Sequence, residues 1–225
     1  MDSLETEELF DIARLRREKT EAATTAALDA MFPYYPSGYI SNLWRRQGLF
    51  FASDTLALLV NELAISHEWG SNLRLLDVGA GPGFGTEFIG DLFSEKGPSG
   101  YQIECDAIDL GQTWARVYPF IHKHARLIVG DIFDMEKNSY DIVICSAVIE
   151  HLERSQAISF VEKMVSISKK TTIITCPWKE DPLNLSQTHV LSIDESFILQ
   201  INPNEYRIYQ SGGWTGECVG MIFRK

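Results

Sequence analysis

The sequence predicts an α/β fold in which a largely parallel sheet is covered by helices on both faces. Three observations predict it. After Gly70, short apolar segments alternate regularly with segments of helical character, which is the pattern of successive β-α-β units. The apolar segments are nearly continuous, as expected for strands that are buried on both faces. The last two strand-like segments lie close in sequence, so they can pair only as an antiparallel hairpin.

The N-terminal part of the chain is predicted to be helical. Residues 2–31 favour helix, which the prolines that follow bring to an end. An aromatic segment rich in turn-forming residues, 34–40, leads to a second helix that runs from about residue 53 to residue 69. The apolar residues of this second helix fall on one face, so we expect it to pack against the sheet. Residues 1–70 are therefore expected to form a helical cap.

The strands and helices after the cap are delimited by turn-forming residues and by acids at strand ends. The expected strands are residues 73–78, 101–108, 127–129, 140–145, 171–175, 205–209 and 218–223. The expected helices begin near residues 84, 113, 154 and 193. A parallel sheet that ends in an antiparallel edge pair is a specific topology.

The composition indicates a globular protein without a polyanionic partner. The chain has 225 residues, of which 45% are hydrophobic and 23% charged, and its formal net charge is −11. Because phosphate backbones are held mainly by clustered Lys and Arg, we expect no nucleic acid partner. No apolar run approaches the length that spans a bilayer, and the acidic start is unlike a secretory signal. We expect a cytoplasmic protein without a membrane partner, as a monomer or homodimer.

The cysteines indicate a reducing environment. Cys105, Cys145, Cys176 and Cys218 are widely separated and form no C-x-x-C pair. Three of them lie within or beside apolar strand-like runs. We therefore expect reduced and mostly buried thiols.

The most informative stretch is the run from Leu75 to Thr86, where a short apolar strand meets a glycine-dense turn. Glycines at alternate positions let the backbone bend sharply and let a ligand lie against peptide groups. The third glycine of a G-x-G-x-x-G dinucleotide motif would fall on Phe84 or on Thr86, so neither register fits. The Gly-Lys-Ser/Thr ending of a phosphate-binding P-loop is also missing. A ligand without a pyrophosphate is therefore favoured.

Together these features resemble the class I methyltransferases that use S-adenosylmethionine, a family with a Rossmann-like, doubly wound, seven-stranded sheet and an antiparallel last strand. The resemblance implies that residues 71–225 form the methyltransferase domain. It rests on four motif positions that occur in order along the chain. These are the acid and glycines of the first turn, Asp109, residues 130–133, and residues 141–152, whose ending Val-Ile-Glu-His-Leu is close to that of ubiquinone-biosynthesis methyltransferases.

The resemblance assigns the first two motif positions to the methionine and ribose parts of S-adenosylmethionine. Gly79, Gly81 and Gly83 would supply the backbone that packs against the ligand, and Asp77 would organise the loop and the ligand's ammonium group. Asp109 lies 26 positions after Gly83, at the end of the second strand, and would accept hydrogen bonds from the ribose hydroxyls. The alternative for Asp109 is a loop acid or helix N-cap.

The other two positions are assigned to the adenine ring and the methionine portion. Asp131 resembles the residue that accepts a hydrogen bond from the adenine amino group, with the backbone of Ile132 reading the ring edge. An acid at this place can equally cap the next turn. Ser146 and Ala147, at the end of the fourth strand, would face the methionine portion.

Candidate catalytic residues lie on two loops that are predicted to converge. A sulfonium methyl group is already electrophilic, so the enzyme must mainly align the nucleophile and exclude water. An aliphatic hydroxyl additionally needs its proton removed. Glu150 and His151 follow the fourth strand and His189 follows the fifth, and the carboxyl ends of parallel strands meet at one edge. We expect His151 or His189 to act as general base beside Glu150; the alternative is that Glu150 and His151 only begin a helix.

No required metal is expected. Some relatives hold a divalent ion with Glu-x-x-Glu-His and a distant histidine, but Ala147 stands here in place of the first glutamate. Glu150, His151 and His189 are a thin ligand set for Mg²⁺, which prefers several oxygens.

The N-terminal cap is expected to form the substrate-specific lid. Its aromatic and guanidinium groups are suited to pack on rings or sugars and to bind an anion. The alternative for each aromatic residue is that it packs between the cap and the core of the domain. The candidate substrate-binding residues are Tyr34, Tyr35, Tyr39, Trp44, Arg45 and Arg46.

On this resemblance the chain transfers a methyl group from S-adenosylmethionine to a small molecule and leaves S-adenosylhomocysteine. An oxygen nucleophile on a sugar, glycan precursor or secondary metabolite is favoured, with methylation of nitrogen or of a protein side chain as the alternative. A non-catalytic module that binds an adenosine ligand and a nicotinamide dehydrogenase are the remaining hypotheses.

Overall fold

The computed structural model describes most of the chain beyond residue 53. The described residues are 26, 54–65, 69–70, 72–93, 101–111, 125–180, 188–210 and 216–225. The predicted helix over residues 2–31, the aromatic segment 34–40 and the predicted helix that begins near residue 113 lie outside these ranges, apart from residue 26.

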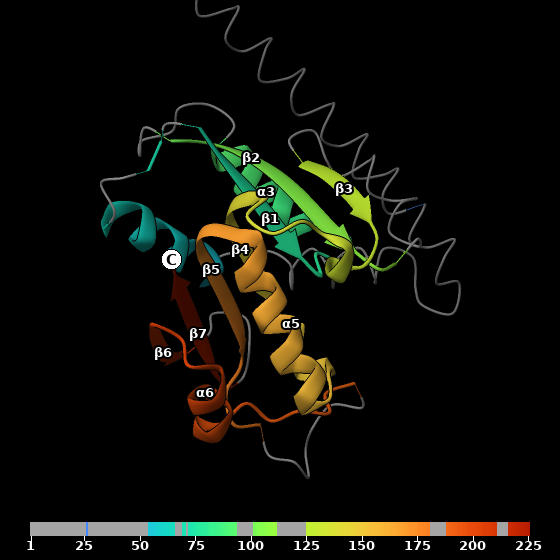
Figure 1. Cartoon of the computed structure of the whole chain (residues 1–225), viewed down its shortest axis with the longest axis vertical. Helices are drawn as coiled ribbons and strands as arrows, with labels where there is room; N and C mark the ends of the chain where they lie inside the picture. The colour runs from blue at the N-terminus through green and yellow to red at the C-terminus, as the bar shows by residue number, and fades with distance from the viewer. Residues whose placement is uncertain are drawn as a thin grey trace, which may run out of the picture.

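A seven-stranded sheet forms the centre of the molecule, in the order β3-β2-β1-β4-β5-β7-β6 (Figure 1). Its strands are β1 (Asn72–Val78), β2 (Gln102–Asp109), β3 (Ala125–Val129), β4 (Tyr140–Ser146), β5 (Ser168–Pro177), β6 (Glu205–Gln210) and β7 (Glu217–Arg224). Strands β1 to β5 pair in parallel, and β7 is antiparallel to both β5 and β6. The predicted parallel sheet with an antiparallel C-terminal hairpin is therefore confirmed.

The strand order places a crevice at the centre of the sheet. The chain moves outward from β1 to β2 and β3, then returns to place β4 on the other side of β1, with Val78 paired to Cys145. The connections that leave β1 and β4 therefore diverge at their carboxyl ends. Open α/β sheets bind ligands at such a switch point.

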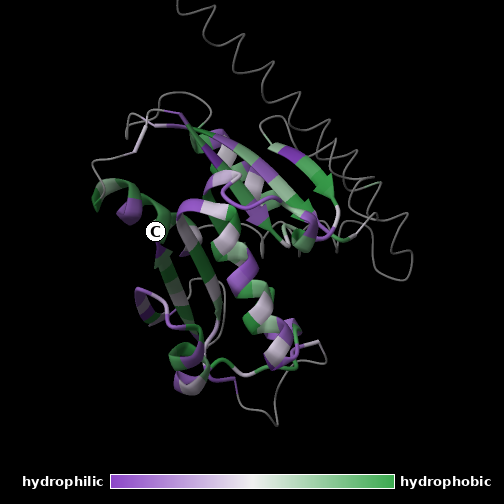
Figure 2. Ribbon diagram, viewed as in Figure 1, coloured by the Kyte–Doolittle hydropathy of each residue, from purple (hydrophilic) through white to green (hydrophobic). Residues whose placement is uncertain are grey.

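Helices cover both faces of the sheet, because successive strand residues point to opposite sides. Leu75 packs into one hydrophobic core with α3 (Phe84–Phe93) and the helix of residues 54–65. Leu76 packs into the other core with α5 (Arg154–Ile167) and α6 (Glu195–Ile201). Both faces are thus buried, which explains the mainly apolar β5 and β7, largely green in Figure 2.

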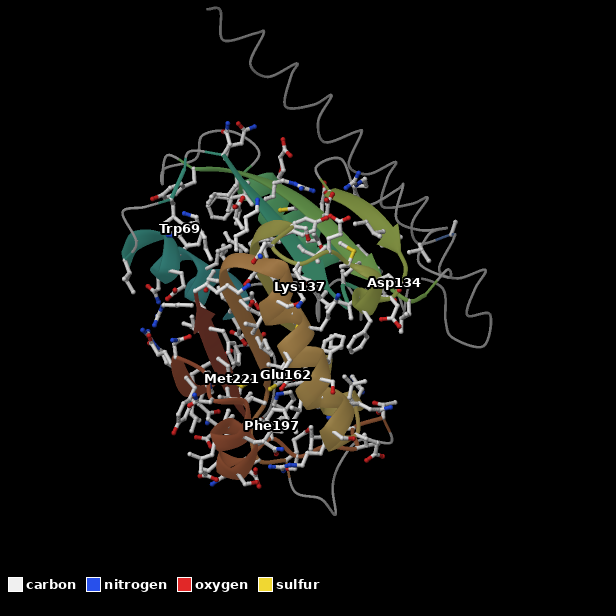
Figure 3. All side chains as sticks on the ribbon, in the orientation of Figure 1. Trp69, Asp134, Lys137, Glu162, Phe197 and Met221 are labelled. Atoms are coloured by element: carbon white, nitrogen blue, oxygen red, sulfur yellow. The ribbon has the colours of Figure 1, made fainter. Side chains whose placement is uncertain are left out.

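The interior is apolar and the outer helix faces are polar. Phe197 of α6 and Met221 of β7 are fully buried in the same core, whereas Glu162 on the outer face of α5 and the nearby Lys137 are exposed (Figure 3). All four cysteines are buried, as predicted, and none of them forms a disulfide. None of the helices in the described ranges has the length and apolarity needed to cross a membrane.

Most strands differ from the predicted bounds by one or two residues at an end, and two of the differences have a clear physical cause. Strand β5 begins at Ser168 instead of residue 171, because Ser168 still pairs with Tyr140 although the sequence there is polar. Helix α6 begins two residues later than predicted, since Asp194 is its N-cap and accepts a hydrogen bond from the amide of Phe197 at 2.9 Å. The residue before this cap, Ile193, packs in the core instead of in the helix.

Candidate functional site

The glycine turn after β1 is a left-handed backbone that follows the edge of the crevice. Gly79, Gly81 and Gly83 have φ values of 72°, 54° and 79°, a region that favours glycine. The amide of Gly79 donates to the carbonyl of Ile108 at 2.8 Å, which ties the turn to β2. A Cβ atom on Gly81 would meet nothing within 4 Å. At Gly81 the turn therefore presents bare backbone to open space, whereas a Cβ atom on Gly79 would lie 2.5 Å from Cγ2 of Val148.

Asp77 lies beneath this turn and organises it. Its side chain is buried, and its Oδ2 accepts a hydrogen bond from Thr86 Oγ1 of α3 at 2.5 Å. Burial raises the pKa of Asp77 to about 6, although the hydrogen bond from Thr86 acts in the opposite direction. The predicted loop-organising role agrees with this contact.

Asp109 stands at the end of β2, on the opposite side of the crevice from β4. One of its oxygens accepts from the amide of Gly81 at 2.9 Å, and the other accepts from the amide of Gly111 at 2.8 Å. The carboxylate is therefore fixed between the glycine turn and the start of the next loop. Each oxygen has lone pairs left for a ligand.

Asp131 caps a short turn beside the same crevice. Its Oδ1 accepts from the amide of Phe133 at 2.9 Å and begins the 3₁₀ turn η2 (Ile132–Asp134). The capping role that the sequence left as an alternative is thus present. The side chain itself is exposed, and the neighbouring Ile132 is buried against the cavity.

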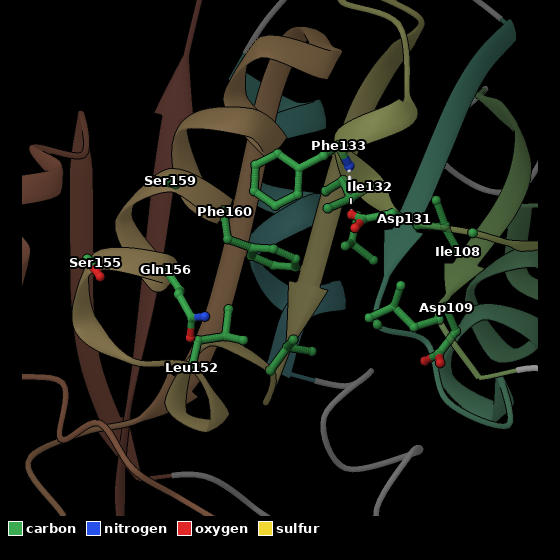
Figure 4. A pocket seen from close by; sticks show the side chains of 15 residues that line it. Ile108, Asp109, Asp131, Ile132, Phe133, Leu152, Ser155, Gln156, Ser159 and Phe160 are labelled. Carbon is green, nitrogen blue, oxygen red and sulfur yellow. Dashed lines mark hydrogen bonds between the residues drawn. The ribbon is translucent and has the colours of Figure 1, made fainter.

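Gly79 of the turn, with Asp109 and Asp131, borders a cavity of about 590 Å³ between the strand ends and α5 (Figure 4). Gly79, Asp109, Asp131 and Ile132 are predicted site residues that line the cavity, and Val148 from the β4 loop also lines it. The predicted Asp77, Gly81 and Gly83 do not line it.

A second wall of the cavity was not predicted; it is formed by one face of α5 together with Leu110 and Phe133. Its α5 side consists of Leu152, Ser155, Gln156, Ser159 and Phe160. These residues are spaced three and four positions apart, and that spacing is the signal from which one lining face of the helix could have been predicted.

Ser146 and Ala147 follow one another at the end of β4 and were predicted to face the methionine portion of the ligand. In the structure their hydrogen bonds are to β5 and to the helix of residues 54–65. Ser146 Oγ is 2.5 Å from Thr55 Oγ1 and 2.8 Å from Thr175 Oγ1. This hydroxyl cluster joins β4 and β5 to the helix of residues 54–65. Ala147 follows with φ of 53°, and its amide donates to the carbonyl of Thr175 at 2.9 Å. Neither residue lines the described cavity; Val148 does.

Glu150, His151 and His189 come together as predicted. One possible ligand atom from each residue lies within 4.8 Å of those of the other two. The two imidazole rings meet edge to face, with centroids 4.7 Å apart and an interplanar angle of 76°. The loops converge because the main-chain oxygen of Glu150 accepts from the amides of Val190 and Leu191, at 2.9 Å and 3.1 Å.

The three side chains have different surroundings. Glu150 is fully buried, and neither carboxyl oxygen has a hydrogen-bond partner among the described residues. Burial, with the nearby charge of Glu180, raises the pKa of Glu150 to about 8. His151 is exposed, and its Nδ1 lies 2.8 Å from the main-chain oxygen of Thr188. His189 is mostly buried, with its Nδ1 2.7 Å from Glu180 Oε2.

A cation would find three protein ligands in this cluster, of which one is a carboxylate and two are imidazoles. Such a set is poorer in oxygen than Mg²⁺ prefers.

The candidate substrate residues Tyr34, Tyr35, Tyr39, Trp44, Arg45 and Arg46 lie outside the described residues. Glu180 was missed as a site residue, because nothing in the local sequence links it to a histidine nine positions away.

A family model described as a methyltransferase domain matches residues 70–197, which is more than half of the chain. No curated protein matches the sequence.

Solved structures of methyltransferases share the fold at low sequence identity. Magnesium protoporphyrin IX methyltransferase from Synechocystis PCC 6803, with bound S-adenosylhomocysteine, has a TM-score of 0.58 and 13% identity over 77% of this chain and 83% of its own. Plantazolicin methyltransferase, in complex with S-adenosylhomocysteine, has a TM-score of 0.60 and 13% identity over 95% and 99%. An S-adenosylmethionine-dependent methyltransferase from Aquifex aeolicus has a TM-score of 0.53 and 18% identity over 79% and 90%.

Proposed function

The chain belongs to the methyltransferase domain family and uses S-adenosylmethionine, and on this premise we propose that its acceptor is a small molecule methylated at oxygen. The observation that carries the proposal is the cluster of Glu150, His151 and His189. An aliphatic hydroxyl needs its proton removed as it attacks, whereas a carboxylate or neutral amine does not. A basic cluster at this edge therefore favours a hydroxyl acceptor.

The described residues fit the methyl donor. The bare backbone at Gly81, the carboxylate of Asp109 and the apolar cavity wall at Ile132 suit, in turn, the amino-acid, ribose and adenine parts of the ligand. Glu150 and His151 follow Val148 in the chain, and His189 follows β5, the neighbour of β4 on the side away from β1. When bound, S-adenosylmethionine supplies a methyl group that is already activated by its sulfonium.

The residues of the chain then have three tasks in the reaction. The glycine turn and Asp109 hold the donor, and Asp131 with Ile132 meets its adenine ring. The loops after β4 and β5 face the acceptor and remove its proton through a histidine. The N-terminal residues Tyr34, Tyr39, Trp44, Arg45 and Arg46 are proposed to bind the acceptor.

Similarity to neighbours supports a small acceptor. Two of the solved structures are named for magnesium protoporphyrin IX and for plantazolicin. The formal charge of −11 disfavours a nucleic acid acceptor. We propose a sugar, a glycan precursor or a secondary metabolite as the class of acceptor, and catalysis without a required metal.

The decisive experiment supplies the protein with S-adenosylmethionine that carries an isotopically labelled methyl group, together with a fractionated metabolite extract. Mass spectrometry then identifies the compound that gains the label, and fragmentation locates it on oxygen. Asp109→Ala is the control that removes the donor site. Label on nitrogen or on a protein side chain would contradict the acceptor proposal, and binding of S-adenosylhomocysteine without any transfer would indicate a non-catalytic module.

A chelator tests the role of metal separately. We expect turnover in excess EDTA to equal turnover in its absence, because the cluster offers one carboxylate and two imidazoles. Loss of activity that added Mg²⁺ or Zn²⁺ restores would show this to be wrong.

A further inference from the structure

The contacts of the two clustered histidines differ enough to give them different tasks. His151 is exposed, whereas the side chain of His189 is 8% exposed and that of its partner Glu180 is 15% exposed. We propose that His151 is the general base, and that Glu180 and His189 are positioning residues which hold its ring. The proposal rests on the proposed function, because a base is needed only if the acceptor loses a proton.

The hydrogen bond of His151 determines which nitrogen is basic. Its Nδ1 lies 2.8 Å from the main-chain oxygen of Thr188. A carbonyl oxygen can only accept, so Nδ1 must carry the proton, and the lone pair of the neutral ring is on Nε2. Because the side chain is exposed, Nε2 is the atom that can meet an acceptor.

Two adjacent residues hold this ring from two directions. Thr188 accepts from Nδ1, and the ring of His189 packs edge to face against the ring of His151, at 4.7 Å between centroids. A hydrogen bond alone allows the ring to rotate about the N–H···O axis, and the ring contact restricts that rotation. The position of residues 188 and 189 therefore sets the direction of Nε2.

Glu180 fixes His189 in turn. Its Oε2 is 2.7 Å from Nδ1 of His189, and a carboxylate that accepts from one ring nitrogen determines how the ring faces. Both side chains are largely buried, so water competes little with this contact. The main chain of Glu180 is tied to the same segment, because Ser192 Oγ donates to its carbonyl at 2.8 Å.

The far side of the segment is held by the β4 loop. The main-chain oxygen of Glu150 accepts from the amides of Val190 and Leu191. Residues 188–192 are thus bound to Glu150 on one side and to Glu180 on the other. His151, in the turn after β4, thus hydrogen-bonds to a segment that is held on both sides.

In the proposed step, the proton of the acceptor hydroxyl passes to Nε2 of His151 while the acceptor oxygen forms a bond to the methyl carbon. The carbon–sulfur bond breaks, and its electron pair stays on sulfur to give S-adenosylhomocysteine. The imidazolium of His151 afterwards returns its proton to solvent, so charge and atoms balance.

Histidine NMR tests the arrangement without any turnover. The protein has five histidines, and ¹⁵N labelling of their rings reports which nitrogen carries the proton. We expect the wild-type His151 ring to show the Nδ1–H form, and Glu180→Ala to give averaged shifts for both His151 and His189. Glu195→Gln is the matched control, because Glu195 pairs with the neighbouring Lys179 at 2.5 Å and should leave both rings unchanged. Unaltered ring shifts in Glu180→Ala would overturn the positioning role, whatever the acceptor proves to be.

Single-turnover rates with the identified acceptor test the division of tasks. General bases contribute about 10²- to 10⁴-fold, so His151→Ala should lower the rate by about 100-fold or more. Glu180→Ala should lower it by about tenfold, with little change in the KM of the acceptor, and Glu180→Asp should recover part of the loss. A wild-type rate in His151→Ala, or a greater loss in His189→Ala than in His151→Ala, would overturn the assignment. Stoichiometric binding of Zn²⁺ that Glu150→Gln abolishes would overturn it too, because the ring nitrogens would then be metal ligands.

Discussion

Buried acids determine the chemistry of individual residues at this site. Asp77 lies beneath the glycine turn and Glu150 beneath the histidines, and burial raises the pKa of each above its ordinary value, to about 6 and about 8. Asp109, by contrast, is only partly buried and holds two amides. The more accessible Asp109 is therefore the acid that we propose to bind the donor.

The raised pKa of Asp77 predicts a stability that depends on pH. The folded state holds a proton on Asp77 up to about pH 6, whereas the unfolded state releases it near pH 4, so stability falls as the pH rises between these values. Asp77→Asn removes this dependence because the amide stays neutral. Relative to wild type, we expect urea denaturation to show Asp77→Asn gaining about 2–3 kcal/mol between pH 4 and pH 7.

An exposed aspartate provides the control for this measurement. Asp134→Asn changes the same functional group at the surface and should show no comparable gain. If the free energies of unfolding of wild type and Asp77→Asn differ by the same amount at both pH values, protonation of Asp77 does not cause the pH dependence of stability.

Asp109 should dominate the affinity for the donor. Its removal takes away a charged acceptor for ligand hydroxyls and also frees the amides of Gly81 and Gly111. Hydrogen bonds to charged groups are worth about 1.5–3 kcal/mol each, so Asp109→Ala should weaken S-adenosylhomocysteine binding by at least about tenfold in calorimetry. Asp109→Asn keeps one acceptor oxygen and should lie between; equal affinity in all three proteins would rule out the ribose contact.

At the scale of elements, the helix of residues 54–65 is joined closely to the functional edge of the sheet. Thr55 reaches the hydroxyls of Ser146 and Thr175 at the ends of β4 and β5. Leu58 packs so close to β7 that a Cβ atom on Gly220 would lie 2.5 Å from its Cδ1. The helix that leads out of the predicted cap is thus in direct contact with the loop that precedes Val148.

Gly220→Ala tests how closely this helix must dock. The added methyl group would overlap Leu58, and overpacking of this kind costs about 1–3 kcal/mol. We expect lower stability in denaturant and faster hydrogen exchange in residues 54–65. Leu58→Ala in the same chain should remove the overlap, so that the two changes together cost less than their sum.

Gly130→Ala is the matched control, because a Cβ atom there meets nothing within 4 Å. Equal destabilisation by the two alanines would mean that backbone freedom, and not the contact with Leu58, explains the loss.

The elements that could be predicted from the sequence are those marked by a pattern within their own residues. Continuous apolar runs identified the strands, and the acid at a strand end identified Asp109. The polar start of β5 was missed, because only its pairing partner Tyr140 makes Ser168 part of a strand. Glu180 and Thr55 were missed for the same reason, since their partners His189 and Ser146 are brought to them by the folded chain.

At the scale of the whole molecule, the two ends of the described chain are tied together across the sheet. Arg224, at the end of β7, donates to both carboxylate oxygens of Glu62, at 2.8 Å and 2.6 Å, although the residues are 162 positions apart. It also donates to Glu205 of β6 at 2.7 Å. The last strand, the edge strand and the helix of residues 54–65 therefore share one ion-pair network.

Breaking this network should loosen the helix that carries Thr55. Arg224→Met leaves Glu62, whose side chain is 5% exposed, without the guanidinium that neutralises it, and loss of one partner of a buried pair typically costs about 3–5 kcal/mol. Since the Arg224 side chain is 35% exposed and water can replace part of the contact, we expect about 1–3 kcal/mol in urea denaturation. Arg207→Met, which removes a more exposed partner of Glu205, should change stability by less than about 0.5 kcal/mol. The double variant Glu62→Leu with Arg224→Met should recover most of the lost stability, because no charge then stays buried. A double variant as unstable as Arg224→Met alone would show that packing of the arginine stem, and not the charge pair, joins the helix to the sheet.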